Sequence, residues 1–217
     1  MFNVIGTGSK GNCFTFGNLM IDLGLPYDRI KNYLGDVTYI LLTHRHNDHL
    51  NLTTLRKVIA NTNATFVCGW WLKEYLPNDK VKIVEAGRNY ELDDYRISPV
   101  IAYHDAPNFG YRIMKDGHKH FHITDTATLD GITARGYDSA SIECNHCEIR
   151  ARELIQEAKE KGEFTHLEGA MNSHLSVQKA IDFCRTNGIK NLIPVHVGES
   201  TKSEVLKALR IWDENLK

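Results

Sequence analysis

The stretch Thr43-His44-Arg45-His46-Asn47-Asp48-His49 follows directly on an apolar run, residues 39–42, that fits a buried strand. It places three imidazoles and one carboxylate within six residues. Neutral imidazole and carboxylate are good ligands for zinc, manganese or iron. His44 and His46 alternate, so both can face one ion, and a turn can then send Asp48 and His49 to a second ion. Histidine-rich loops also occur by chance on surfaces, but this spacing after a buried strand favours a metal site.

The pattern His-x-His-x-Asp-His in this setting resembles the signature of the metallo-β-lactamase superfamily, and further motifs of that family follow in order along the chain. His104 follows a predicted strand, Asp125 follows another, and His196 ends a third. The resemblance implies that His44, His46, His104 and Asp125 hold one divalent ion, and that Asp48, His49, Asp125 and His196 hold a second. It also implies an α/β (α+β) fold, the αββα sandwich of two mixed β-sheets flanked by helices.

The coarse pattern of apolar residues agrees with that architecture. Strands come first in runs and then alternate with helices, in two successive sets, which favours two sheets with helices outside. We predict one domain over residues 1–217. The predicted strands are residues 2–5, 13–16, 19–22, 39–43, 65–68, 81–84, 96–103, 111–114, 118–124, 139–144 and 192–196. One predicted helix begins at Pro26. The other predicted helices cover residues 52–60, 70–76, 149–161, 176–186 and 202–216.

Composition narrows the class of protein. Lys and Arg number 26 against 27 Asp and Glu, so the net charge of -1 provides no global positive field for nucleic acid. Five cysteines without a secretory start predict reduced thiols and a cytoplasmic protein. No apolar run approaches the roughly 20 residues of a membrane span, so we expect no membrane partner.

The expected chemistry follows from two ions at one site. Two ions about 3.5–4 Å apart bridge a water and lower its pKa toward 7, which provides a hydroxide nucleophile without a catalytic serine or cysteine. The ions are expected to be zinc or manganese, with iron as a further candidate. The resemblance implies that Asp125 is the bridging carboxylate. True zinc β-lactamases lack this residue, whereas phosphodiesterases and thioesterases of the superfamily use it.

Two further segments bear on catalysis. Glu143 lies at the end of an apolar strand, and His174 opens the segment His174-Leu175-Ser176. They resemble the strand-end glutamate and the His-Leu-Ser/Thr segment of the phosphodiesterase branch, in which the glutamate orients a histidine near the leaving oxygen. A carboxylate–imidazolium pair can donate a proton to a departing alkoxide. We therefore predict Asp48, Glu143 and His174 as catalytic residues, Asp48 being also a ligand.

Four segments together resemble the small single-domain YycJ-type enzymes of the superfamily. They are Gly8-Ser9-Lys10-Gly11-Asn12-Cys13, His104-Asp105-Ala106, Glu143-Cys144-Asn145-His146 and His174-Leu175-Ser176. That resemblance implies a DNA exonuclease, with DNA or a nucleotide-type phosphodiester as its partner. A small-molecule phosphodiesterase acting on a cyclic nucleotide or a dinucleotide is the first alternative, favoured by the neutral charge balance. A glyoxalase II-like thioesterase or lactonase is the second. The motifs carry no signal for an oligomeric state.

Weaker signals also have alternative readings. His118, His120 and His122 alternate along one strand, which favours a solvent-exposed or substrate-facing strand over a third metal site. Trp70 and Trp71 are expected to pack in the core, with a base-stacking platform as the alternative. Asp22, after a strand, is a candidate acceptor for a ligand histidine, and a structural strand-end role is equally favoured.

Overall fold

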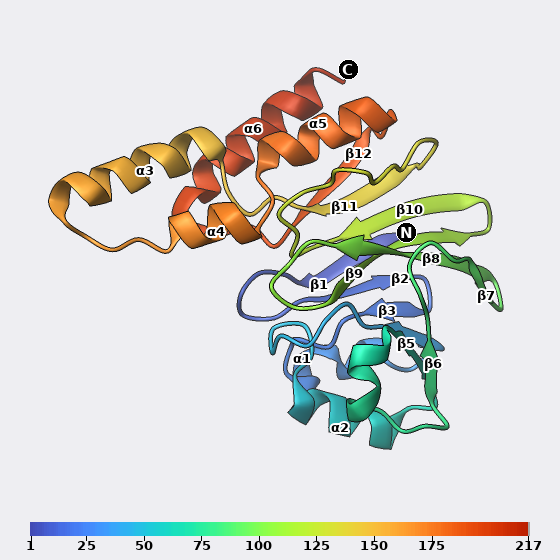
Figure 1. The fold of residues 1–217 in the computed structure, drawn as a ribbon. Helices are drawn as coiled ribbons and strands as arrows, with labels where there is room; N and C mark the ends of the chain where they lie inside the picture. The colour runs from blue at the N-terminus through green and yellow to red at the C-terminus, as the bar shows by residue number, and fades with distance from the viewer. Residues whose placement is uncertain (217) are drawn as a thin grey trace.

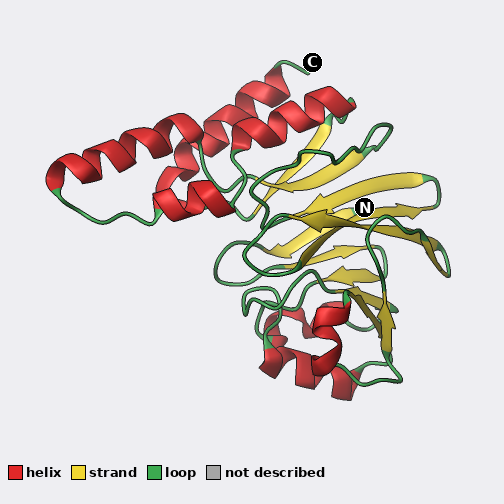
Figure 2. Ribbon diagram, viewed as in Figure 1, coloured by secondary structure: helices red, strands yellow, loops and turns green. Residues whose placement is uncertain are grey.

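Two six-stranded mixed β-sheets face one another, and helices cover the outer side of each sheet (Figure 1, Figure 2). The computed structural model describes residues 1–216, so Lys217 at the end of the predicted domain lies outside the described residues. The arrangement confirms the predicted αββα sandwich. Within residues 1–216, no helix is both long and apolar enough to cross a membrane.

The first sheet has the strand order β1-β2-β3-β4-β5-β6. Its strands are β1 (Phe2–Gly6), β2 (Cys13–Phe16), β3 (Leu19–Ile21), β4 (Tyr39–Leu41), β5 (Thr65–Cys68) and β6 (Val81–Ile83). β1, β2 and β3 pair antiparallel through short turns, and β3 to β6 pair parallel. Parallel neighbours need crossover connections. These contain α1 (Tyr27–Ile30), the 3-10 helix η1 (Lys31–Tyr33), α2 (Leu52–Asn61) and the 3-10 helix η2 (Trp70–Tyr75).

The second sheet has the strand order β12-β11-β10-β9-β8-β7. Its strands are β7 (Tyr90–Leu92), β8 (Tyr95–Ala102), β9 (Asn108–Lys115), β10 (His118–Ile123), β11 (Ser139–Glu143) and β12 (Asn191–Val195). β7 to β10 pair antiparallel, and β10, β11 and β12 pair parallel. The helical part consists of α3 (Glu148–Lys161), α4 (Leu167–Ser173), α5 (Val177–Asn187), the 3-10 helix η3 (Glu199–Thr201) and α6 (Lys202–Glu214).

Alternation along the strands produces three apolar layers. In β4, Ile40 packs toward the helices of the first sheet, and Leu41 packs between the two sheets. In β10, Phe121 and Ile123 pack toward the helices of the second sheet. Successive side chains of a strand point to opposite faces, so each central strand contributes to two layers. The core between the sheets therefore holds the two halves of the molecule together.

The expectation for His120 and His122 is wrong, because both side chains lie in the core between the sheets with 0% exposure. The ring of His120 stacks on Phe2 at a centroid distance of 4.2 Å. Ser141 lies 2.8 Å from His120 Nε2 and 2.7 Å from His122 Nδ1. Burial lowers the pKa of His122 to about 3, so its imidazole is neutral. These histidines replace apolar residues on the inner face of β10.

The ends of five strands bring the predicted functional residues to one edge of the sandwich. Asp22 follows β3, and the histidine-rich segment begins just after β4. Asp125 follows β10, Glu143 ends β11, and His196 follows β12. All five strands run parallel to a neighbour, so their carboxyl ends meet at the same edge within each sheet, where ligands bind in many α/β proteins.

Candidate metal centre

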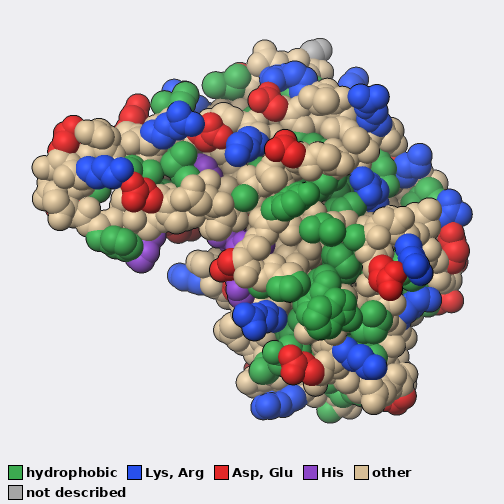
Figure 3. All heavy atoms as spheres, viewed as in Figure 1, with side chains coloured by type: hydrophobic (Ala, Val, Ile, Leu, Met, Phe, Trp, Pro, Cys, Tyr) green, Lys and Arg blue, Asp and Glu red, His purple; other side chains and the backbone are tan. Residues whose placement is uncertain are grey.

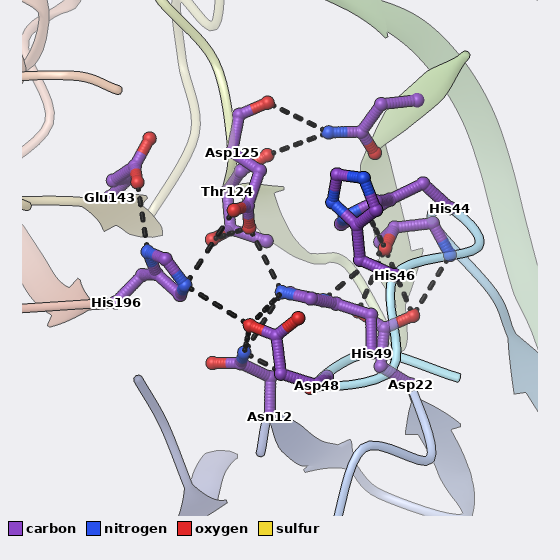
Figure 4. Close-up of polar contacts among 12 residues, drawn as sticks. Asn12, Asp22, His44, His46, Asp48, His49, Thr124, Asp125, Glu143 and His196 are labelled. Atoms are coloured by element: carbon purple, nitrogen blue, oxygen red, sulfur yellow. Dashed lines mark hydrogen bonds and ion pairs between the residues drawn. The ribbon is translucent and has the colours of Figure 1, made fainter. Parts of the chain in front are cut away.

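The seven predicted metal ligands lie together at this edge, between loops from both sheets. Figure 4 shows all of them except His104. Three overlapping groups contain them, and within each group the ligand atoms lie within 4.8 Å of one another. The first group is His44 with His46 and His104, the second is Asp48 with His49 and His196, and the third, His44 with His49 and Asp125, joins these two groups. Residues up to 152 positions apart in the chain, from His44 to His196, are thus neighbours in space.

The first group consists of three imidazoles. His44 Nε2 lies 3.1 Å from His46 Nδ1, which lies 3.3 Å from His104 Nε2. His44 is buried, and burial lowers its pKa below the ordinary range for histidine. Burial also lowers the pKa of His104. Neutral imidazole is the form that binds a metal, and three nitrogens facing one point suit a cation better than hydrogen bonds among themselves.

The second group contains two imidazoles and a carboxylate. His196 Nε2 lies 3.4 Å from Asp48 Oδ2, and His49 Nε2 lies 3.6 Å from the same oxygen. Burial disfavours the charged form of His196, but its hydrogen bonds to Asp48 and Glu143 outweigh burial and raise the pKa to about 10. In the protein without metal, protons on imidazole therefore balance the buried carboxylates. Divalent cations can supply the same positive charge, so the donor set fits them.

Asp125 lies between the two groups. Its Oδ2 is 3.0 Å from His49 Nε2, and its Oδ1 is 3.6 Å from His196 Nε2 and 3.9 Å from His104 Nε2. Burial favours the protonated form, but His49 above all holds the pKa of Asp125 well below its usual range. The carboxylate is therefore ionised, and its two oxygens face histidines that belong to different ligand groups.

Asp22 supports the histidine-rich segment from below. Its carboxylate lies 2.6 Å from His49 Nδ1 and accepts hydrogen bonds from the backbone N–H and the hydroxyl of Thr43. All three side chains are buried. The contact between Asp22 and His49 is the one predicted, and the role of His49 as a metal ligand stays a prediction. The contact orients the ring so that Nε2 faces the centre.

Glu143, His174 and His196 form a second connected unit. Glu143 Oε1 lies 2.6 Å from His174 Nδ1 and 3.0 Å from His196 Nδ1. Its Oε2 accepts from the backbone N–H groups of Thr126 and Leu175. Glu143 is fully buried, and the donating imidazoles lower its pKa against the effect of burial. Partial burial lowers the pKa of His174, but the hydrogen bond to Glu143 outweighs this effect and raises the pKa.

Three residues of the centre have left-handed backbone conformations. They are Asp22 with φ 59° and His196 with φ 52°, each directly after a strand, and Asp125 with φ 54°, two positions after the end of β10. Such conformations are uncommon outside glycine and cost of order 1–3 kcal/mol each. Surrounding contacts must hold them, and for His196 one such contact is the hydrogen bond from its N–H to Thr7 Oγ1, at 2.7 Å. The left-handed backbone conformation at these three positions therefore directs their side chains toward the centre.

Asn12 and Asp105 touch the centre but were not predicted as site residues. Asn12 Nδ2 lies 2.8 Å from His49 Nε2 and donates to the Asp48 carbonyl. Asp105 Oδ1 lies 3.1 Å from His104 Nε2 and 3.4 Å from His46 Nε2. Both lie in segments quoted for the family resemblance. Their roles depend on loop conformation, which residue spacing does not encode.

The remaining predictions have different outcomes. All five cysteines are buried and free, and the ligand groups found among residues 1–216 contain none of them. Trp71 packs against Phe109 at a centroid distance of 4.6 Å. Trp70 is 72% exposed, so the expectation that it packs in the core is wrong.

Comparisons with known proteins agree with this fold. A family model described as a beta-lactamase superfamily domain matches residues 22–197. The exodeoxyribonuclease WalJ of Streptococcus pneumoniae is 29% identical over 168 residues, covering 67% of this chain and 62% of that protein. The exodeoxyribonuclease YycJ of Bacillus anthracis is 28% identical over 172 residues, with the same coverage. The chain thus spans about 62% of the length of these curated relatives.

A solved structure extends the comparison over nearly the whole fold. The metallo-beta-lactamase fold protein YhfI from Bacillus subtilis has a TM-score of 0.75 and 14% sequence identity. The match covers 97% of this chain and 91% of that protein. At this identity the likeness concerns the fold.

Proposed function

Because this chain belongs to the beta-lactamase superfamily, we propose that it is a metal-dependent phosphodiester hydrolase and, more specifically, a DNA exonuclease. The observation that carries the proposal is the 2.6 Å hydrogen bond between His174 Nδ1 and the buried Glu143, next to the ligand groups. A phosphodiester leaves as an alkoxide, which needs a proton, and this pair can supply one. The names of the curated relatives support DNA as the substrate.

The residues that would hold the ions are those that the sequence predicts. His44, His46 and His104 would hold one ion, Asp48, His49 and His196 the other, and Asp125 would bridge them. When bound, two divalent ions supply a hydroxide nucleophile near neutral pH and positive charge beside the phosphoryl oxygens. Zinc or manganese suits this set of imidazoles and carboxylates, and iron also binds such donors.

The protein's own groups would carry the proton. Glu143 accepts the hydrogen on His174 Nδ1, which leaves Nε2 to donate to the departing oxygen. The raised pKa of His174 keeps it protonated for this task. Backbone N–H groups of Thr126 and Leu175 hold the Glu143 carboxylate in place. Glu143 thus positions the histidine, and His174 is the proposed general acid.

A small nucleotide is the second candidate substrate, because the net charge of -1 gives no broad attraction to a polymer. A thioesterase or lactonase would share the ligands, and the thiolate that leaves a thioester, unlike an alkoxide, needs no proton from His174. These three substrate classes can be separated by experiment.

The test uses end-labelled double-stranded DNA, single-stranded DNA and RNA, incubated with the protein and added manganese or zinc. A ladder from one end, abolished by EDTA and by His174→Ala, is the expected result. Cleavage of a cyclic nucleotide or dinucleotide without any polymer degradation would replace DNA by the small substrate. Hydrolysis of thioesters or lactones without cleavage of any phosphodiester would contradict the proposal.

A further inference from the structure

An apolar groove opens beside the metal centre, between η2 and the end of β8. In Figure 3, hydrophobic side chains gather over this part of the surface. The groove has a volume of about 640 Å³, which lies in the range of small-molecule sites. Its lining includes the aromatic residues Trp70 and Trp71 of η2, and Ile101 and Tyr103 near the end of β8.

The groove is continuous with the centre because His104 and Asp105 line both. Asp105 Oδ1 lies 3.1 Å from the Nε2 atom of His104, which belongs to the first ligand group. A molecule whose reacting bond lies at the centre therefore places its next chemical group in the groove. Continuity with the site limits the occupant to a part of the substrate.

The lining favours a flat, uncharged group. Trp70, Ile101 and Tyr103 are 72%, 57% and 51% exposed, which is unusual for large side chains with no partner. The charged residues among the described lining are the acids Glu85 and Asp105, and no lysine or arginine is among them. A phosphate would be repelled here, whereas a nucleobase would stack on the exposed indole.

We infer that this groove binds the nucleobase next to the scissile phosphate, with Trp70 as the stacking residue and Tyr103 as the opposite wall. The inference rests on the proposed function, since it names the part of a nucleotide substrate that the groove receives. Stacking tolerates every base, so the groove recognises a nucleotide without reading its sequence. That property suits an enzyme that removes residues one after another.

Binding of two monophosphates tests the groove independently of turnover. Thymidine 5′-monophosphate carries a base and ribose 5-phosphate does not, so their dissociation constants are compared by calorimetry with the zinc-loaded protein. We expect Trp70→Ala to weaken thymidine monophosphate binding by about 5-fold to 100-fold, the range for loss of one stacked base. Ribose 5-phosphate binding should change less than about 2-fold, and Trp70→Phe should restore most of the affinity.

Kinetics provides the second readout. For thymidine 5′-(p-nitrophenyl phosphate), Trp70→Ala should lower kcat/KM by a similar factor, mostly through KM. Methyl p-nitrophenyl phosphate, which has no base, should react equally with both proteins. Tyr33→Ala is the matched control, because Tyr33 is an aromatic residue with 45% exposure that does not line the groove.

Three outcomes would overturn the inference. The first is equal affinity of the wild type for the two monophosphates, and the second is a Trp70→Ala effect of equal size on both. The third is a dimer in sedimentation that Trp70→Ala dissociates without changing nucleotide binding, which would assign the groove to a second copy of the chain. If the wild type hydrolyses no diester, the proposed function fails, while the calorimetry still decides whether the groove binds a base.

Discussion

Among single residues, Asp125 connects the two ligand groups, because its two oxygens face histidines of both. Asp125→Asn keeps the shape but removes the charge that attracts two cations. We expect bound metal to fall from two ions per chain to one or fewer, and hydrolysis to fall at least about 100-fold, since charge stabilisation at such a site contributes several kcal/mol. Metal content by mass spectrometry and steady-state rates provide the measurement.

Asp130→Asn is the control for this change, because Asp130 is an exposed aspartate that belongs to none of the ligand groups. Its metal content and activity should match the wild type. An Asp125→Asn protein that retains two tightly bound ions would refute the bridging role.

His174 allows a prediction that depends on the leaving group. An alkoxide from DNA needs a proton, whereas p-nitrophenolate leaves without one. His174→Ala should therefore slow DNA cleavage by about 10²-fold to 10⁴-fold and slow hydrolysis of a p-nitrophenyl diester by less than about 10-fold. The ratio of the two rate losses is the quantity to measure. Equal losses on both substrates would show that His174 acts in some other way, for example by binding phosphate.

At the scale of elements, β10 carries two buried imidazoles where apolar side chains would be expected. His122 has a pKa of about 3 in the folded protein and about 6.5 when unfolded. Between these values the unfolded chain binds more protons, so stability is complete above pH 6.5 and falls as the pH decreases toward 3. From pH 7.5 to pH 5 this histidine alone should remove about 2 kcal/mol of unfolding free energy.

His122→Phe keeps an aromatic ring beside Phe14 and removes the titration. Urea unfolding of both proteins at pH 7.5 and pH 5 should show a smaller loss for the variant, by about 2 kcal/mol. If both proteins lose the same stability, protonation of His122 does not contribute to acid destabilisation.

Most elements of the fold could be predicted from the sequence, because apolar runs and turn residues mark them directly. The strands β2 and β5 have the predicted boundaries, and the predicted strand over 39–43 is β4 with a shorter end. β7 and α4 were not predicted. β7 has three residues, and α4 has Gly169 and Asn172 within seven residues, so neither has a clear apolar period.

The part of the candidate site that depends on short sequence segments could be predicted. The histidine-rich segment was identified from its own residue types, whereas the later strand-end residues were identified through the family resemblance. The burial of His120 and His122 on the inner face of β10 was not predicted, because alternation alone does not say which face of a strand is buried. The exposure of Trp70 also depends on how η2 packs, which no local pattern determines.

At the scale of the whole molecule, the centre joins the two sheets, because His44, His46, Asp48 and His49 follow β4 while Asp125 and His196 follow strands of the second sheet. Bound ions would stabilise the folded state relative to the unfolded one. At a free ion concentration 1,000 times the dissociation constant, the gain is about 4 kcal/mol per site. For a chain of this size that gain raises Tm by roughly 8–16 °C.

Calorimetric scans with zinc, with manganese and with EDTA measure this effect. The protein in EDTA should melt at the lower temperature and recover the higher one when metal is restored. An unchanged Tm in all three conditions would argue against a metal centre that spans the two sheets.

The hydrogen bond between Thr7 and His196 joins residues 189 positions apart, and β12 is the last strand in chain order. During synthesis, the histidine-rich segment leaves the ribosome long before His196 does. A nascent chain can therefore form much of the first sheet while the second group of ligands is still incomplete. Hydrolytic capability would arise only after β12 has been synthesised, so the order of biosynthesis itself delays activity until both sheets exist.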